Sequence, residues 1–212
     1  MTHSIQEKHK IQGRTAAIIK QLYSKGDLKK GILASVRHAP TVDSPQAQAL
    51  WPLLMKYLTP NMLSSDGQPT AQEIAVYTAV RLYAVHQQST KSFVFGAVEP
   101  QNDEQTGEPL FRVLAQLRGS EDTRVALDRR VQPLLATTNL ASVINALTHL
   151  VSILKATKPS LKIDYAQLAQ DLYWFQQNYK QANRIRLQWG EAYYRSTKST
   201  KTTKTTEGKK NK

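Results

Sequence analysis

Apolar residues recur at intervals of three and four along most of this chain, which is the spacing that places them on one face of an α-helix. The stretch from Leu140 to Leu154 follows the pattern without a gap. The stretch 70–88 is apolar on nearly every side, as is typical of a helix buried at the centre of a fold. We therefore expect an all-α protein, a compact bundle of eight or nine helices with no significant sheet.

Capping and breaking residues predict where several of these helices begin and end. Thr70 and Glu73 have the spacing of a capping box, and Asn139 is placed to cap the helix that follows it. Gly26 is expected to stop a first helix that begins near residue 5, and Asp27 to cap a second one. That second helix should end before the proline at position 40.

Three segments are harder to assign from the pattern. A third helix is expected from Ser44 to Thr59, with Pro52 placed where it can delay the start. The segment SFVFGAVEP, residues 92–100, has the composition of a short strand, but no second strand is evident to pair with it. A helix is expected from about Glu121 to Ala136, with Pro133 placed where it can end or kink it.

The stretch from Asp164 to Arg195 predicts two helices, each with an apolar stripe. The first stripe consists of Tyr165, Leu168, Ala169, Leu172, Phe175 and Tyr179, and the second of Ile185, Trp189, Ala192 and Tyr193. Opposite the second stripe lie Arg184, Gln188, Glu191 and Arg195. A helix with buried aromatic rings on one side and guanidinium groups on the other is suited to rest on a core and face an anionic partner.

The charge of the chain supports the same expectation. The 212 residues carry a net charge of +13, and residues 196–212 hold six lysines and one glutamate, so the remaining residues are basic in their own right. A basic domain attracts nucleic acid, the commonest large anion in a cell. The alternative is that the charge only maintains solubility. We expect one helical domain over residues 1–195, with two helical subdomains as an alternative, and a disordered basic tail over residues 196–212.

The residues that would indicate an enzyme, a metal site or a membrane protein are missing. The chain has no cysteine, no glycine-rich phosphate loop and no G-x-S-x-G motif. Its five histidines lack the spacing of metal ligands on a helix. No run approaches the roughly 20 apolar residues of a membrane span, and the N-terminus has no apolar signal region. We expect a cytoplasmic protein with no catalytic residue, no metal and no cofactor.

Several stretches together resemble a known family. They are GILASVRHAP, ALWPLLMKYL, AVYTAVRLYAVHQQ, EQTGEPLFRVLAQLRGSEDTR, RRVQPLLATTNLASVINALTHLV, LYWFQQ and RLQWGEAYY. In their order and spacing they resemble the CasB family, the small subunit of the type I-E CRISPR surveillance complex Cascade. The resemblance implies an all-helical, non-catalytic protein of antiviral defence. It also implies assembly as paired copies beside the large subunit and the backbone subunits, in contact with guide RNA and target DNA, including the displaced strand.

The resemblance also assigns roles to individual basic residues. Arg37, Arg129, Arg130 and Arg184 match basic positions of the family, whereas Asn139, Asn145 and His149 stand where relatives often carry arginine. With the basic residues of the helical pattern, the candidate contacts to nucleic acid are Arg37, Arg81, Arg118, Arg129, Arg130, Lys180 and Arg184. Such contacts would be made to the phosphate backbone rather than to base edges, because sequence would be read by the guide RNA.

Two other functions fit the same sequence. The chain could be a structural spacer that binds only protein, with Trp174 and the acidic loop after residue 98 as its interface. It could also be a helix-turn-helix regulator, for which the first two helices, joined at residues 24–27, are the only candidates. Binding to nucleic acid without sequence preference would separate the expected function from both.

Overall fold

The computed structural model describes residues 2–23, 28–98, 106–119 and 121–195, with side chains from residue 11 onward. These residues form nine α-helices and two 3₁₀ helices, which confirms the all-α prediction. The elements are α1 (Thr2–Leu22), α2 (Lys30–His38), η2 (Pro45–Leu50), α3 (Trp51–Tyr57), η3 (Pro60–Met62), α4 (Ala71–Gln87), α5 (Leu110–Leu117), α6 (Glu121–Ala136), α7 (Leu140–Thr157), α8 (Tyr165–Phe175) and α9 (Tyr179–Tyr194). The expected basic tail, the expected caps at residues 26 and 27, and residues 99–105 of the acidic loop lie outside the described residues.

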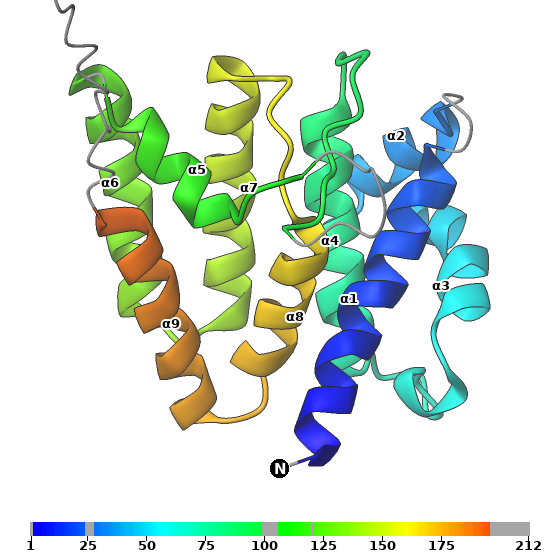
Figure 1. Cartoon of the computed structure of the whole chain (residues 1–212). Coiled ribbons are helices and arrows are strands. Elements are labelled where there is room, and N and C mark those ends of the chain that lie inside the picture. The colour runs from blue at the N-terminus through cyan, green and yellow to red at the C-terminus, as the bar shows by residue number, and fades with distance from the viewer. Residues whose placement is uncertain (1, 24–27, 99–105, 120, 196–212) are drawn as a thin grey trace, which may run out of the picture.

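The helices are arranged around a central group made of α4, α7 and α8. Helix α8 packs against both α1 and α4, and α4 also packs against α7. On one side of this group lie α1, α2 and α3, and on the other side lie α5, α6 and α9 (Figure 1). The buried side chains of both sides form one continuous hydrophobic cluster. The molecule thus has a shared core, and helices from both ends of the chain contribute to it.

Helix α4 is deeply buried, as its apolar composition predicts. Among its buried residues are Val76, Tyr77, Val80, Leu82 and Tyr83. The predicted capping box is confirmed: the Thr70 hydroxyl accepts from the Glu73 amide at 3.1 Å, and the Glu73 carboxylate accepts from the Thr70 amide at 2.8 Å. The Asn139 cap of α7 is confirmed as well. Local capping therefore fixes the start of two central helices.

Some predicted boundaries are wrong. The single helix expected over 44–59 is divided into η2 and α3, because α3 begins at Trp51 with Pro52 in its first turn. Helix α6, by contrast, has the expected bounds, Glu121–Ala136, and it runs through Pro133 without ending there. Helix α2 begins later than expected, after Lys29, which makes no side-chain cap. Tyr179 does not belong to the stripe of α8: it starts α9 and is 71% exposed, since Asn178 caps a new helix there.

The segment around Phe95 does find a β partner, contrary to the sequence-based expectation. Ile163, just before α8, forms parallel bridges with both Phe95 and Glu108. The Ile163 amide donates to Val94 O at 3.0 Å, and the Gly107 amide donates to Ala97 O at 2.8 Å. We call these backbone contacts the Ile163 clasp. They are isolated bridges, so the prediction that the chain has no significant sheet holds for the described residues.

The clasp requires glycine at position 107. A Cβ atom added to Gly107 would lie 2.0 Å from the carbonyl oxygen of Gly96, which is backbone and has no rotamer to change. We expect Gly107→Ala to lower the free energy of unfolding by about 1–3 kcal/mol, the usual cost of forcing extra volume into a packed site. Gly119→Ala is the matched control, because its Cβ would meet nothing closer than 3.8 Å. Urea unfolding of both variants checks this, and equal stabilities would contradict it.

Helix α7 is the only described helix that is long and apolar enough, by length and composition, to cross a membrane. Its apolar residues Val143, Leu147, Leu150 and Leu154 are buried, and the helix packs against α4, α5 and α6. The core helix of a globular protein passes the same test. The composition of α7 is thus explained by its place in the bundle.

Candidate nucleic-acid interface

Arg37 lies in the last turn of α2 and reaches across to α4. Its Nη1 donates a long hydrogen bond, 3.5 Å, to the carbonyl oxygen of Ala84. That carbonyl belongs to the last turn of α4, where backbone oxygens have no partner within the helix. The guanidinium therefore complements the C-terminal ends of both helices. Arg37 remains half-buried, and burial lowers its pKa.

Arg81 lies on the side of α4 that faces α7. Its Nη1 donates to the Thr148 hydroxyl of α7 at 3.0 Å. Its Nε is buried and finds no hydrogen-bond partner among the described residues. Burial lowers the pKa of Arg81, and the nearby Tyr77 acts in the opposite direction. This arginine thus joins two central helices and still has a donor to offer.

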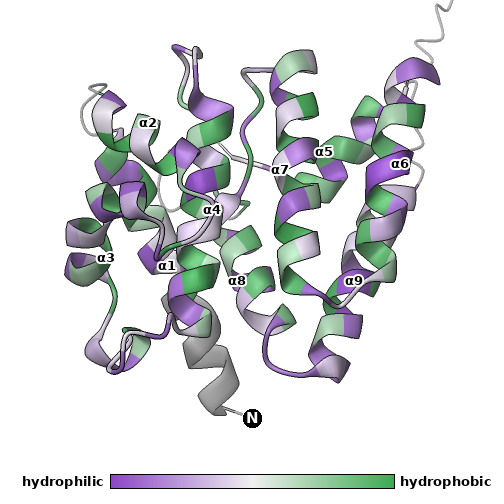
Figure 2. Cartoon of the chain, turned by 180° about the vertical axis from the view of Figure 1, so that it is seen from behind, coloured by the Kyte–Doolittle hydropathy of each residue, from purple (hydrophilic) through white to green (hydrophobic). Residues whose placement is uncertain are grey.

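Lys155, in the last turn of α7, completes a group with these two arginines. Its Nζ donates to the side-chain oxygen of Gln88, just after α4, at 2.8 Å. The pKa of Lys155 is lowered, first by burial and then by the positive charge of Arg37. We call Arg37, Arg81 and Lys155 the basic seam, because they lie where α4 packs between α2 and α7 (Figure 2).

The basic seam is not neutralised within the fold. All the protein partners of its three cations are neutral, and no carboxylate of the described residues pairs with any of them. Neither α2 nor α7 contains an acidic residue. Partly buried cations that repel each other are stabilised when an anion binds between them. Beside the seam, α7 exposes Asn145, His149 and Ser152, so the surface next to it is polar.

Arg129 and Arg130 lie on α6, which packs against α7. Arg129 is exposed and makes no ion pair with any described residue. Arg130 is half-buried, and its Nη1 donates to Ala126 O one turn earlier on its own helix at 3.0 Å. Arg124 of the same helix is instead paired with Glu121. Two of the three arginines of α6 therefore have no carboxylate partner in the described part of the chain.

Arg118, after α5, is held inside the fold. Its Nε and Nη2 donate to the two carboxylate oxygens of Asp128, both at 3.2 Å, and this hydrogen bonding is the main cause of its raised pKa. The guanidinium also lies over the rings of Tyr193 and Tyr194, at 4.9 and 5.2 Å from their centroids. These contacts tie α5, α6 and α9 together. They give Arg118 a structural role, and its contact with nucleic acid stays a prediction.

Lys180 and Arg184 are exposed on α9, which lies beside α5, α6 and α8. Gln188, Glu191 and Arg195 are exposed too, while Trp189 on the opposite side is buried, as the sequence pattern predicts. Trp189 donates from its Nε1 to Asp171 of α8 at 2.8 Å and stacks on Phe111 and Phe175. The aromatic side of α9 therefore anchors the helix, and its basic side faces solvent.

The candidate residues do not all converge on one site. Arg37 and Arg81 meet in the basic seam, Arg129 and Arg130 share α6, and Lys180 and Arg184 share α9. Lys155 was not singled out by the sequence, since one lysine at the C-terminal end of an apolar helix is explained by the helix dipole alone. The absence of acidic residues from α7 is the signal that could have identified it.

The acidic and histidine side chains of the described residues do not form a metal site. No three histidine, aspartate or glutamate side chains lie close enough to hold a metal ion within the part of the chain that the structure describes. The best-buried histidine, His86, hydrogen-bonds the Tyr165 hydroxyl at 2.9 Å in the core. Burial lowers its pKa to about 4. This histidine is a neutral core residue near physiological pH.

Comparisons with known proteins identify the family and a similar fold. The family model described as CRISPR-associated protein Cse2 matches residues 32–194. Among solved structures, the crystal structure of CasB from Thermobifida fusca is similar, with a TM-score of 0.60 and 22% sequence identity over 86% of this chain and 94% of that chain. At this identity the likeness shows a shared fold. No curated protein matches the sequence.

Proposed function

The chain belongs to the CRISPR-associated Cse2 (CasB) family of Cascade subunits, and from this premise we propose that it is a non-catalytic subunit that stabilises the R-loop of type I-E Cascade. The R-loop consists of guide RNA paired with target DNA and of the displaced strand. The subunit would hold these strands through sequence-independent contacts to their backbones. It would act in the cytoplasm, in paired copies beside the large subunit and the backbone subunits.

The observation that carries this proposal is the basic seam. Cations from three helices line this junction without a carboxylate partner among the described residues. Arg37 is near enough to Lys155 to lower its pKa, and Arg81 has a buried donor still unpaired. Such an arrangement raises the free energy of the isolated protein, and phosphate oxygens would lower it. Phosphate contacts also release counterions, so binding should weaken as salt is added. Each contact should steepen the slope of log binding constant against log salt concentration by about 0.7–0.9.

A second candidate function is that of a spacer that contacts only protein. It is favoured by an apolar hollow of about 300 Å³ in the N-terminal half, lined by Val42, Trp51, Leu54, Met55 and Leu63 among others. Met55 is 64% exposed at this hollow. A protein partner could bury that surface. Removing basic residues should weaken target binding if the chain holds nucleic acid, and should leave it unchanged if the chain is a spacer.

The arginines of α6 provide the direct test. In the assembled complex, Arg129→Glu together with Arg130→Glu should shorten the lifetime of the R-loop roughly three- to tenfold and lower the salt slope of target binding. The effect is moderate because exposed charges are screened by salt. Target dissociation followed across a salt series measures both quantities, and the far-UV circular dichroism of the chain should not change.

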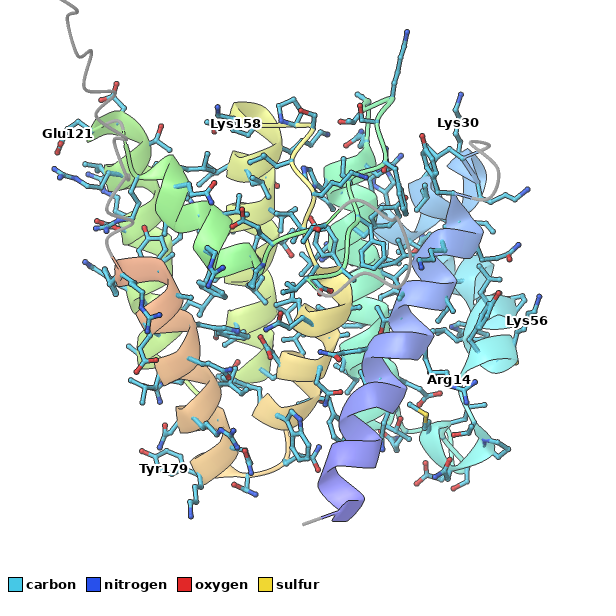
Figure 3. The ribbon with its side chains drawn as sticks, viewed as in Figure 1. Arg14, Lys30, Lys56, Glu121, Lys158 and Tyr179 are labelled. Carbon is cyan, nitrogen blue, oxygen red and sulfur yellow. The ribbon has the colours of Figure 1, made fainter. Side chains whose placement is uncertain are left out.

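The matched control carries the same change of charge elsewhere. Lys30 and Lys56 point outward from α2 and α3, at the edge of the molecule opposite α6 and α9 (Figure 3). Lys30→Glu with Lys56→Glu should leave R-loop lifetime nearly unchanged. If both double variants lose affinity equally, only overall charge matters. If neither does, the spacer function is favoured.

A further inference from the structure

Tyr194, in the last turn of α9, is an exposed aromatic residue with a fixed ring. It is 46% exposed, although most large apolar residues of the described chain are buried. The guanidinium of Arg118 lies 5.2 Å from its ring centroid. The ring of Tyr193 meets it in a T-shaped contact at 4.9 Å. The ring is therefore covered in part by the protein and open to solvent in part.

The group that supports this ring is itself held in place. Asp128 binds Arg118 through both carboxylate oxygens, and it also accepts a hydrogen bond from the Tyr193 hydroxyl at 2.5 Å. Three helical regions thus fix the guanidinium under Tyr194. Because the ring is already ordered in the free protein, a ligand that stacks on it loses little binding free energy to side-chain ordering.

A hollow of about 450 Å³ lies beside Tyr194, between α6 and α9. Leu135, Leu187 and Gly190 line its apolar part, and a Cβ at position 190 would make an ordinary contact of 3.4 Å with Leu135 Cδ1. Arg186 is fixed in its wall, because its Nε donates to Leu135 O at 2.6 Å and its Nη1 to Asn183 Oδ1 at 2.7 Å.

The chemistry of the hollow suits a nucleobase better than a phosphate. Glu191 also lines it, and its carboxylate would repel a phosphate but can accept from the amino groups or ring N–H groups of a base. The phosphates of the same strand would instead meet the exposed cations Lys180 and Arg184 of α9 and Arg195 just after it. From Arg195 the sequence continues into the lysine-rich residues 196–212. The outer side of α9 is not covered by another described element (Figure 1).

We propose that Tyr194 and the adjoining α6–α9 hollow form a stacking site for an unpaired base of single-stranded nucleic acid. This inference rests on the proposed function and adds a contact of a different kind, since stacking on an aromatic ring does not depend on charge. Stacking tolerates any base, because every base has a π face. It would therefore favour single strands over duplex without reading sequence.

The test compares Tyr194→Ala and Tyr194→Phe in the full-length protein. The probe is an oligothymidylate that carries one 2-aminopurine, whose fluorescence changes when the base stacks. Tyr194→Ala should bind roughly five- to 150-fold more weakly, the loss expected for one stacked base, and should lose the fluorescence change. Its salt slope should equal that of the unchanged protein, since no charge is removed. Tyr194→Phe keeps the ring and should behave like the unchanged protein.

Tyr179→Ala is the matched control. Tyr179 is the more exposed tyrosine, at 71%, and it projects from the other end of α9 (Figure 3) with no cation–π contact among the described residues. Its loss should leave single-strand affinity unchanged. The stacking site is ruled out if Tyr194→Ala keeps its affinity, or if the unchanged protein binds no single strand at low salt. It is also ruled out if Tyr194→Ala only impairs assembly into Cascade, which would make this surface a protein interface. The proposed function is judged separately, by the R-loop lifetime of the arginine variants.

Discussion

Lys155→Glu is expected to lower the affinity of the assembled complex for target DNA roughly thirtyfold without destabilising the protein. Lys155 and Arg37 repel each other in the basic seam. The new carboxylate would pair with Arg37 and neutralise the seam from within, so a phosphate would lose its contact with Lys155 and meet a competitor for Arg37. A hydrogen bond to a charged group contributes about 1.5–3 kcal/mol, and part-buried charges are screened less than exposed ones. Equilibrium binding to a matched target measures the loss.

The stability of the same variant separates binding from folding. The substitution replaces a repulsion from Arg37 by an attraction, but it also removes the hydrogen bond to Gln88 and the favourable charge at the C-terminal end of α7. These effects offset one another, so the free energy of unfolding should change little. Lys56→Glu is the control: it makes the same change of charge on α3, and it should leave target affinity nearly unchanged. A variant with Lys155→Glu that is stable and binds target normally would remove the basic seam from the nucleic-acid interface.

Acidification is expected to destabilise the protein through His86. Burial lowers the pKa of His86 from 6.5 to about 4, so the unfolded chain binds a proton at a pH where the folded protein does not. The stability that depends on neutral His86 is therefore fully present above pH 6.5 and is lost as the pH falls toward 4. The loss over this range is about 3 kcal/mol, at about 1.4 kcal/mol for each pH unit of the shift. Urea unfolding at several pH values measures it.

The substitution His86→Gln isolates this contribution. Glutamine can still hydrogen-bond the Tyr165 hydroxyl, but it does not titrate. Its stability should thus fall less between pH 6.5 and 4 than that of the unchanged protein. His149→Gln, on the exposed side of α7, should keep the full pH dependence. Burial raises the pKa of Asp164, so its protonation favours the folded state as the pH falls. This contribution to stability is the same in all three proteins and cancels from the comparison. Identical pH profiles for His86→Gln and the unchanged protein would refute the assignment.

The fold was predictable wherever a local pattern determined it. The structure contains the helix α4 that is apolar on nearly every side, and the predicted caps at Thr70 and Asn139. It also contains the predicted aromatic stripe of α9. The errors arose where a pattern continued past a break. Tyr179 keeps the helical spacing of the preceding stripe, yet Asn178 starts a new helix and turns the residue outward. The spacing of apolar residues alone does not show where one helix ends and another begins in a new direction.

The candidate site and the Ile163 clasp were less predictable, because their contacts join residues far apart in sequence. The pairing of Ile163 with Phe95 and Glu108 has no local signal. The same holds for Arg118, which the sequence presents as one more surface arginine and the structure binds to Asp128. Lys155 and Arg37 become neighbours only when α2, α4 and α7 assemble. The sequence therefore predicted a basic surface, and tertiary packing determined which cations lie close together on it.

The position of α8 has a consequence for synthesis on the ribosome. This helix covers α1 and α4, yet it is translated after α5, α6 and α7. The apolar sides that α1 and α4 turn toward α8 thus have no native cover until most of the chain has left the exit tunnel. The nascent N-terminal half is expected to remain a substrate for chaperones, and the whole subunit to fold in one late cooperative step rather than helix by helix.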